Sequence, residues 1–361
     1  MKPSLHHRQA GIALIIVMIC ITVLSILAAG FAYSMKVETR LARNAKAEAD
    51  FYPLAQSAVD YCKAVLVASA NCPEEPFDAE TQIWAGGTMS ACSNSVLDFV
   101  QRTVDLGYGR FTWKMIDLER YANINTADPA LLEQAMRLIG VDDGDAGATV
   151  AAIQDWIDPD QNPHVNGTES DYYESLVPPY RAKDGWIDDL SELLLIRGIT
   201  PEMYGLESAP PPPPPEFRDQ VGFAAPPVQR ATLRQLFTPL SSGLININTA
   251  SAEVLQLVPF IDENVAQQII WCRSGQDLGF PTPFRNPGEG LLCAGLNQMV
   301  VGMIQNRFTV RSLTFQVEID AEIDGIHRQY YAVLRRNSPR DVQVLMFYWK
   351  LNKPVAHAGV N

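Results

Sequence analysis

The sequence predicts an α+β fold in which one long N-terminal helix packs on an antiparallel sheet, with a large all-α domain inserted between the strands. Three observations carry this prediction. An uncharged N-terminal run continues into a helical pattern, alternating strand patterns flank the middle of the chain, and that middle contains a repeated motif. With 47% hydrophobic residues over 361 positions, the chain can bury the cores of two or three such units.

The N-terminal run, residues 12–33, has no charged side chain and follows a short, mildly basic segment, residues 1–11. As a helix of 22 residues it would reach about 33 Å, enough to cross a bilayer. This run has three interpretations. It could be a cleaved secretory signal, a plain membrane anchor, or part of a leader sequence that is cut after Gly11 and leaves Ile12 as the new N-terminus. The run is too long for a secretory signal. By the positive-inside rule, the flanking charges would weakly place the part after the run in the cytoplasm, but this preference is too weak to decide the orientation.

The helix is expected to continue well beyond the apolar run. Apolar residues from Val37 to Leu66 recur at steps of three, four or seven, and most residues between Lys36 and Glu48 are good helix formers. Pro53 is a candidate kink. A subunit that polymerises through its helix needs such an extension and a secreted enzyme does not, which favours the cut leader.

Strand patterns lie on both sides of the middle segment. Residues 110–118 place Phe111, Trp113 and Met115 on one face of a strand. A second alternating run starts at Phe308, Asp324-Gly325 signals a hairpin, and residues 326–334 and 342–348 supply further strands. Because the strands come from both sides, the segment between them is expected to be an insertion.

The inserted segment, about residues 121–304, has helical patterns and an internal repeat. Asn-Ile-Asn-Thr-Ala occupies residues 123–127 and again 246–250. Asp128 and Ser251 then stand where a helix needs an N-cap, and Pro129 suits the first helical position. Six prolines, residues 210–215, predict a stiff spacer or loop between the copies.

This repeat resembles the helix-hairpin-helix unit of DNA-binding proteins, in which glycines let backbone N–H groups reach a phosphate. Here both hairpins, residues 139–144 and 258–263, carry acids, and carboxylates repel phosphate. The net charge of −13 also argues against nucleic acid as a partner. A helical scaffold for protein contacts is therefore the favoured interpretation.

Acidic residues are concentrated in one stretch of the insert. Thirteen acids and two bases lie between Asp142 and Glu192, so these 51 residues carry most of the net charge. Calcium needs several carboxylates and carbonyls on a loop that can wrap around it. The Pro/Gly/Asn-rich loop after Trp156 fits this need. The candidate ligands are Asp155, Asp158, Asp160, Glu169 and Asp171.

Other interpretations of these acids stay open. Two carboxylates could act as general acid and base, as in glycosidases. Asp158 could be a turn residue before Pro159, and the cluster could be a solvated acidic face. The sequence has no Ser/His/Asp set, phosphate-cradling glycine loop or HExxH motif, and only His164 and His327 lie outside the leader and the tail. An enzyme is therefore not expected.

Four cysteines bracket two loop-rich stretches, Cys72 with Cys92 and Cys272 with Cys293. The absence of C-x-x-C from the sequence disfavours zinc or thioredoxin-like chemistry. Two loop-closing disulfides in an oxidising periplasm are expected, with unpaired buried thiols as the alternative.

Together these features resemble the general secretion pathway protein K family, the minor pseudopilins of bacterial type II secretion systems. The resemblance rests on RQAGIALIIVMICITVLSILAAGFAYSMKVETR, NINTADPALL, DWIDPDQNPHVNGTESDYY, PPYRAKDGWIDDLSELLLIRGITPEMY and LININTASAEVLQLVPF. It implies a pilin fold with an inserted domain of helix-hairpin-helix/SAM-like repeats, Ca²⁺ in that domain, cleavage after Gly11 by prepilin peptidase, and N-methylation of Ile12.

The expected organisation follows from the resemblance and the patterns together. It comprises a leader (1–11), a membrane span (12–33), the helix continuation with the first part of the pilin-like domain (34–120), the insert (121–304) and C-terminal strands (305–361). Within the insert we expect repeat 1 at about 121–205, a Pro-rich loop at 206–232 and repeat 2 at about 240–304.

The resemblance also implies a place at the tip of the pseudopilus, a function in its initiation, and a function in export of folded proteins across the outer membrane. The implied partners are minor pseudopilins I and J, the major pseudopilin and the inner-membrane assembly platform, with the bulk of the chain periplasmic. Major pilins carry Glu at the fifth mature position, where this sequence has Ile16, which suits a topmost subunit. The alternative is a membrane-tethered DNA-binding or DNA-uptake protein.

Overall fold

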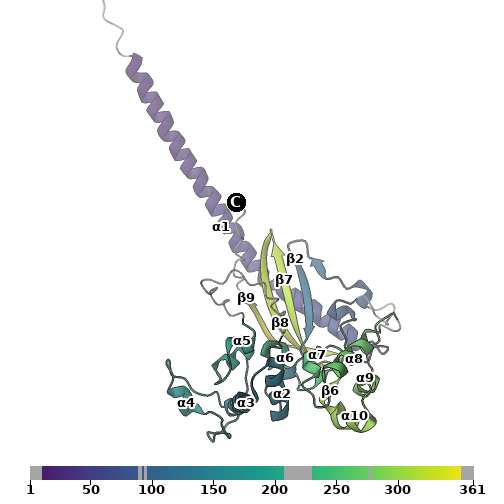
Figure 1. Ribbon diagram of the computed structural model, residues 1–361. Helices are drawn as coiled ribbons and strands as arrows, with labels where there is room; N and C mark the ends of the chain where they lie inside the picture. The colour runs from purple at the N-terminus through teal and green to yellow at the C-terminus, as the bar shows by residue number, and fades with distance from the viewer. Residues whose placement is uncertain (1–9, 88–91, 93–95, 207–229, 276–278, 351–361) are drawn as a thin grey trace, which may run out of the picture.

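The computed structural model describes residues 10–350 except 88–91, 93–95, 207–229 and 276–278. Most of the expected leader and of the expected Pro-rich loop therefore lies outside the described residues, as do residues 351–361. Figure 1 shows one long helix, a sheet beside its C-terminal half, and a largely helical domain beyond the sheet.

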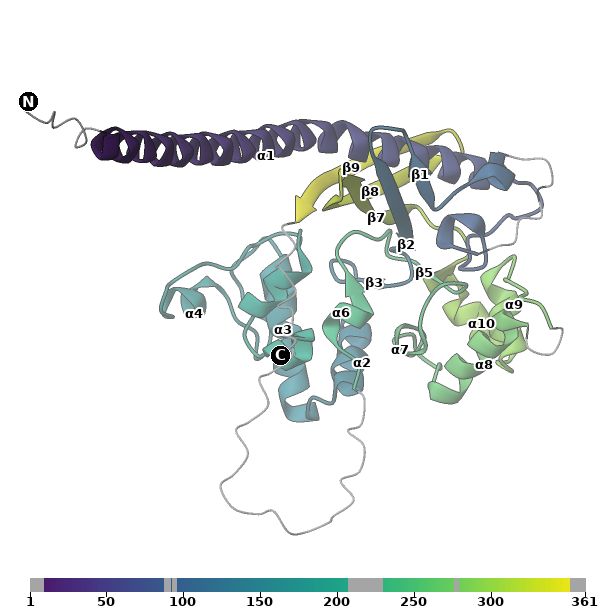
Figure 2. The same cartoon turned by 90° about the horizontal axis from the view of Figure 1, so that it is seen from above.

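The long helix, α1 (Ala10–Ala70), has two halves with different surroundings (Figure 2). From residue 13 to residue 46 every side chain is exposed, and this half includes the helix's candidate membrane span. From Ala47 onward one face of the helix is buried against the sheet. Pro53 lies inside α1, which continues past it as helix.

The main sheet has five antiparallel strands in the order β1–β2–β7–β8–β9. Their bounds are Thr103–Asp105, Arg110–Asp117, Thr314–Ile323, Ile326–Ser338 and Asp341–Lys350. Strand β2 pairs with β7, so that Trp113 lies opposite Ile319 although the whole insert separates them in sequence. The expected fold of a long helix on an antiparallel sheet is confirmed.

One core fills the space between α1 and this sheet. The side chains that the sequence placed on one face of β2, Phe111, Trp113 and Met115, are buried in it together with α1 residues from Ala47 to Leu66. The predicted hairpin is present, with Asp324 and Gly325 at φ angles of 51° and 78° between β7 and β8. Both angles lie in the left-handed region that a two-residue hairpin turn requires.

The insert consists of short helices around a second core. Its helices are α2 (Pro129–Ile139), α3 (Asp143–Ile157), α4 (Ser170–Glu174), α5 (Pro201–Tyr204), α6 (Leu233–Leu236), α7 (Ala252–Leu255), α8 (Glu263–Ser274), α9 (Pro287–Cys293) and α10 (Gln298–Ile304), with 3-10 turns η3 (Leu190–Leu195) and η4 (Gln305–Arg307). Two further 3-10 turns, η1 (Ile83–Ala85) and η2 (Val96–Phe99), precede the main sheet.

Two small parallel pairings tie the insert together: β3 (Ala122–Asn123) with β4 (Phe237–Thr238), and β5 (Ile245–Asn246) with β6 (Phe308–Thr309). The expectation that Phe308 starts a main-sheet strand is therefore wrong. Phe308 pairs with Ile245 and is buried in the insert's core, and the main sheet resumes only at Thr314. A local alternation could not distinguish these two sheets.

A buried polar network joins the insert to the sheet. The Asn246 side-chain amide lies 3.0 Å from the Asp117 carboxylate, 2.8 Å from the Ser312 hydroxyl and 3.0 Å from the Asp78 carbonyl. Thr249 donates to the same Asp117 carboxylate at 2.5 Å. Asp78 in turn pairs with Arg336 of β8, and both side chains are buried. The second motif copy is thus fixed directly to the end of β2.

Two disulfides close loops, as the sequence predicts. Cys72 is bonded to Cys92 beyond the end of α1, and Cys272 at the end of α8 is bonded to Cys293 at the end of α9. The cysteines without a disulfide among the described residues are Cys20 in the exposed half of α1 and Cys62, which is buried against the sheet.

Candidate metal centre

The acidic stretch forms a loop that is wound around one buried side chain at the end of α3. The Asp155 carboxylate is fully buried; one oxygen accepts a hydrogen bond of 3.0 Å from the His164 backbone and contacts the His164 ring at 2.5 Å. The other oxygen accepts a hydrogen bond from the Thr168 backbone. Gly167 passes so close that a Cβ there would lie 1.9 Å from the Asp155 oxygen. Asp155 therefore holds the loop in its shape.

Three carboxylates converge on the inner side of this loop. Asp158 follows the last residue of α3, and oxygens of Asp158, Asp160 and Glu169 all lie within 4.8 Å of one another. One oxygen of Asp158, both oxygens of Glu169 and one oxygen of Asp184 are buried without a hydrogen-bond partner among the described residues. Burying a carboxylate oxygen without a partner costs free energy, and a cation could supply the missing partner for these groups.

The carboxylates interact strongly enough to shift their pKa values. Burial, and next the charges of Asp155 and Asp158, raises the pKa of Glu169 to about 7. Burial and the neighbouring Asp160 raise the pKa of Asp158. Like charges this close disfavour one another's ionised form. A bound divalent cation would reverse that effect and stabilise all of them as carboxylates.

The donor chemistry fits a hard cation. Asp158, Asp160, Glu169 and Asp184 offer carboxylate oxygens, which calcium prefers. Zinc favours nitrogen and sulfur ligands. The one nearby imidazole, His164, is already engaged with Asp155, and that hydrogen bond raises its pKa.

The structure separates the five candidate ligands. It brings Asp158, Asp160 and Glu169 together, and it places Asp155 beside them with both oxygens occupied by the loop. Asp171 is exposed on α4 and belongs to none of the described groups that could hold an ion. Sequence reasoning missed Asp184, whose charge acts on both Asp158 and Glu169. Asp184 comes from the loop beyond α4, and no spacing rule connects it to Asp158.

The repeated asparagines have a structural function. Asn125 donates to the Ile187 carbonyl at 2.9 Å and accepts from the Ile187 N–H at 2.7 Å. Asn248 makes the same two-point clamp on Phe284, at 3.0 and 2.9 Å. The first copy thus fixes the chain just beyond Asp184, and so positions one wall of the metal centre.

The hairpins of the two repeats end in helices capped by acids. Asp262 accepts a hydrogen bond of 2.8 Å from the Val265 N–H at the start of α8, and Asp142 precedes α3. The Asp262 carboxylate thus occupies a helix N-terminus at which a phosphate would bind, whereas Asp142 makes no side-chain cap bond and only adds negative charge before α3. Negative charge at both positions disfavours a phosphate ligand at these two hairpins.

The part of the chain that contains this loop is similar to known proteins. Residues 114–206, which include α3 and the acidic loop, match the family model described as type II secretion system (T2SS), protein K. Type II secretion system protein K of Aeromonas hydrophila is 26% identical over 217 residues, covering 55% of this chain and 61% of the relative. That of Pectobacterium carotovorum subsp. carotovorum is 28% identical over 165 residues, covering 42% and 50%.

The chain is similar to type II secretion system protein K of these bacteria. It spans about half to three fifths of the length of these two protein K relatives. A chain in the crystal structure of the GspK-GspI-GspJ complex from the enterotoxigenic Escherichia coli type 2 secretion system shares its fold, with a TM-score of 0.61 and 16% identity. The match covers 85% of this chain and 99% of that one.

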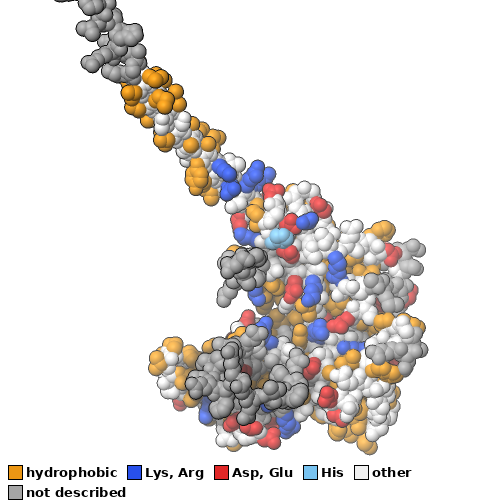
Figure 3. Space-filling model, turned by 45° about the horizontal axis from the view of Figure 1, so that its top comes forward, with side chains coloured by type: hydrophobic (Ala, Val, Ile, Leu, Met, Phe, Trp, Pro, Cys, Tyr) orange, Lys and Arg blue, Asp and Glu red, His pale blue; other side chains and the backbone are white. Residues whose placement is uncertain are grey.

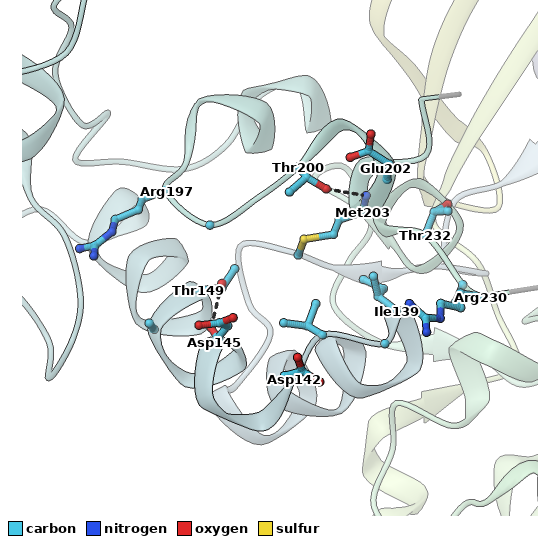
Figure 4. A pocket seen from close by; sticks show the side chains of 15 residues that line it. Ile139, Asp142, Asp145, Thr149, Arg197, Thr200, Glu202, Met203, Arg230 and Thr232 are labelled. Carbon is cyan, nitrogen blue, oxygen red and sulfur yellow. Dashed lines mark hydrogen bonds between the residues drawn. The ribbon is translucent and has the colours of Figure 1, made fainter. Parts of the chain in front are cut away.

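A hollow in the first repeat lies beside α3 (Figure 4). Its volume is about 660 Å³, and the α2–α3 hairpin, the turn at Gly198 and the residues from Arg230 to Thr232 line it. Thr149 and Thr200 are engaged in helix hydrogen bonds, and Arg197 points away, toward Thr168. No histidine or cysteine is among the described residues that line this hollow.

Proposed function

We propose that this chain is a minor pseudopilin at the tip of the type II secretion pseudopilus, where it serves pseudopilus initiation and the export of folded proteins across the outer membrane. The observation that carries the proposal is the division of α1. Its first half exposes all of its side chains, including apolar Val37 and Leu41, while its second half is sealed by the sheet. An exposed apolar helix of this kind requires a bilayer or neighbouring helices.

The position of the insert favours the tip. The insert projects beside the sheet, on the side away from α1 (Figure 2). A domain of this size would crowd neighbouring subunits in a tightly packed shaft but not at its end. We interpret its two repeats as helix-hairpin-helix/SAM-like units that serve as a scaffold for protein contacts. The chain as a whole is proposed to be a structural component without enzymatic activity.

The proposed partners are minor pseudopilins I and J in the tip complex, then the major pseudopilin and the inner-membrane assembly platform. The solved complex of similar fold contains the three proteins GspK, GspI and GspJ. Co-expression of the full chain with the I and J proteins of its own system should give a complex that survives purification. Leu41→Asp should abolish this complex, whereas Leu292→Asp, at another exposed position, on α9, should not. Absence of any complex with the unaltered chain would contradict the proposal.

The N-terminus is proposed to be processed by prepilin peptidase between Gly11 and Ile12, with methylation of Ile12, leaving one pass through the inner membrane and the bulk of the chain in the periplasm. Gly11 and Ile12 stand near the start of α1, and the disulfides suit an oxidising compartment. Mass spectrometry of the mature chain should find methylated Ile12 as its first residue. A chain that retains residues 1–11 in cells with active peptidase would contradict this processing.

Ile16 is proposed to suit the chain to the topmost position. It is exposed in α1, and an apolar side chain needs no partner for a buried charge. Ile16→Glu should allow docking beneath another subunit and so delay pseudopilus initiation, with Val17→Glu as a positional control. Unchanged initiation by Ile16→Glu would show that Ile16 has no such function.

The metal centre is proposed to bind Ca²⁺ through Asp158, Asp160, Glu169 and Asp184, with Asp155 positioning the loop. Chelation should lower the melting temperature of the chain, and Asp158→Ala should remove this dependence. Asp171→Ala is the matched control, because that acid is nearby, exposed and outside the group. A calcium effect lost in both variants, or in neither, would contradict the assignment.

A further inference from the structure

Three cations form a stripe on α1 just beyond the candidate span. Lys36, Arg40 and Arg43 are separated by four and three residues, so they lie on one face of the helix. Figure 3 shows basic side chains gathered where the apolar part of α1 ends. All three side chains are exposed, and among the described residues none has an acid within salt-bridge distance. Glu38 is two residues from both Lys36 and Arg40 and so lies on another side of the helix, and Glu48, further along α1, is paired with Arg328.

Arg40 and Arg43 also line a hollow. With Asn44 they face Asp324 and Ile326 at the tip of the β7–β8 hairpin, across a volume of about 700 Å³. The hairpin tip thus overhangs the basic stripe without filling the space beside it. One carboxylate, Asp324, faces the two guanidinium groups, so the lining keeps an excess of positive charge.

The height of these residues above a membrane follows from helix geometry. At 1.5 Å per residue, Lys36 lies about 5 Å and Arg40 about 10 Å beyond Tyr33, the last residue of the uncharged run. The headgroup layer on each side of a bilayer core is about 5–7 Å thick. Helix side chains tilt toward the N-terminus, which in α1 is the membrane side. Lys36 and Arg40 therefore reach the headgroups, and Arg43 lies within about 10 Å of them, a Debye length.

We propose that Lys36, Arg40 and Arg43 form a docking surface for the phosphate groups of anionic phospholipids in the outer leaflet of the inner membrane. The inference rests on the proposed membrane placement of residues 12–33 and goes beyond it, since an apolar span alone has no preference between lipid headgroups. The stripe also stands on the side of the span where the positive-inside rule disfavours cations, so its presence there needs a compensating contact. Anionic headgroups supply that contact.

The position of the three cations on the helix favours a lipid over a protein as their binding partner. Apolar Val37 and Leu41 lie on a different side of the helix from the three cations. The apolar side is therefore available to neighbouring helices while the basic side remains directed at the bilayer surface. Binding here would hold α1 at a fixed depth and orient the insert relative to the membrane.

The test uses the full chain in vesicles of phosphatidylcholine with or without phosphatidylglycerol. Phospholipids retained by the chain after mild extraction are counted by native mass spectrometry. Phosphatidylglycerol should be retained in preference to phosphatidylcholine by about fivefold or more, and Arg40→Gln with Arg43→Gln should lose this preference. Arg335→Gln with Arg340→Gln, which removes the same charge from exposed positions on β8 and the β8–β9 turn, should keep it.

Equal retention of the two lipids, or a preference that the Arg40/Arg43 variant keeps, would overturn the proposal. Failure of the membrane placement is visible separately in the same vesicles. Cys20 lies within the span and has no disulfide partner, so a water-soluble maleimide would modify it only if residues 12–33 were outside the bilayer. An unmodified Cys20 together with no lipid preference would reject the docking surface and leave the span intact.

Discussion

The two copies of the Asn-Ile-Asn-Thr-Ala motif begin alike and end differently. In both, the second asparagine clamps a distant backbone peptide and the next capping residue starts a helix. After α3, the first copy continues into the acidic loop around Asp155; after α8, the second continues into the Cys272–Cys293 disulfide. The motif therefore sets the local geometry. Hydrogen bonds to Asp155 fix the loop after the first copy, and a disulfide fixes the loop after the second.

The copies also differ in what they are attached to. Asn246 and Thr249 of the second copy bond to the Asp117 carboxylate at the end of β2. Asn123 of the first copy bonds at 2.5 Å to the Ser241 carbonyl, which belongs to the insert itself. The second copy is thus the fixed base of the insert, whereas Asn123 of the first copy is held within the insert itself.

The largest expected effect concerns this attachment. Asn246→Ala should lower the free energy of unfolding by about 3 kcal/mol or more, because it leaves buried Asp117 and Asp78 groups short of a donor. Asn123→Ala should cost about 1–2 kcal/mol, since it releases only backbone groups and no buried charge. Denaturant unfolding of the two variants measures both. Equal losses would mean that the second copy is not the base.

The disulfide gives the next effect. Replacing Cys272 and Cys293 by Ala should lower stability by about 3 kcal/mol, because the cross-link closes a loop of 21 residues and limits the unfolded chain. Calcium should still stabilise this variant, because the metal centre belongs to the other repeat. Calorimetry with and without calcium tests the separation, and loss of the calcium effect would show that the two cross-links are coupled.

The junction beside the second copy predicts a pH dependence. Burial, and next the charge of Asp117, raises the pKa of Glu119 to about 8, and burial also raises the pKa of Asp117. An acid whose pKa is raised by folding stabilises the folded chain while it is protonated. This stabilisation by Glu119 is fully present below its ordinary pKa of 4.5 and is lost as the pH rises toward 8.

Glu119→Gln should therefore flatten the decline in stability between pH 5 and pH 8 by about 2 kcal/mol. Glu133→Gln, an exposed acid on α2 of the first copy, should leave the decline unchanged. If the wild-type chain became more stable relative to Glu119→Gln as the pH rises from 5 to 8, the predicted direction of the pH dependence would be wrong.

The smallest effect compares the two hairpins. Gly140 and Phe260 both have left-handed backbone angles, with φ of 88° and 70°. Phe260→Asn should stabilise the chain by about 0.5–1 kcal/mol, since asparagine tolerates this conformation and the Phe260 side chain is 60% exposed. Gly140→Ala should destabilise it by about 1 kcal/mol or more, because a Cβ there would also lie 2.8 Å from the Arg230 guanidinium carbon. Thermal unfolding of both variants provides the measurement.

Much of the fold followed from periodic patterns in the sequence. The alternation of Phe111, Trp113 and Met115 predicted β2 and its buried face, and Asp128 with Pro129 predicted the start of α2. Phe308 was assigned to the wrong sheet because two residues of alternation carry no information about the partner strand. The fold of a long helix on a sheet followed from local patterns, whereas strand pairing across the insert depended on tertiary contacts.

The candidate site was predictable only where its residues are close in sequence. Asp158, Asp160 and Glu169 belong to one loop, so their spacing indicated a cation site. Asp184 is far from this loop in sequence, and only the tertiary structure brings it close. Both oxygens of Asp155 accept hydrogen bonds from the loop, which depends on how the loop winds back onto this residue. Asp171 has a suitable residue type and position in sequence, but the short helix α4 presents it to solvent.

Hydrogen exchange of the wild-type chain, measured with calcium or a chelator and with or without a reductant, tests the comparison of the two repeats most directly. The account predicts that the chelator speeds exchange in residues 158–187 and leaves residues 279–293 unchanged, while the reductant does the reverse. Equal loosening of both loops by either treatment, or a first loop that does not respond to chelation, would contradict it.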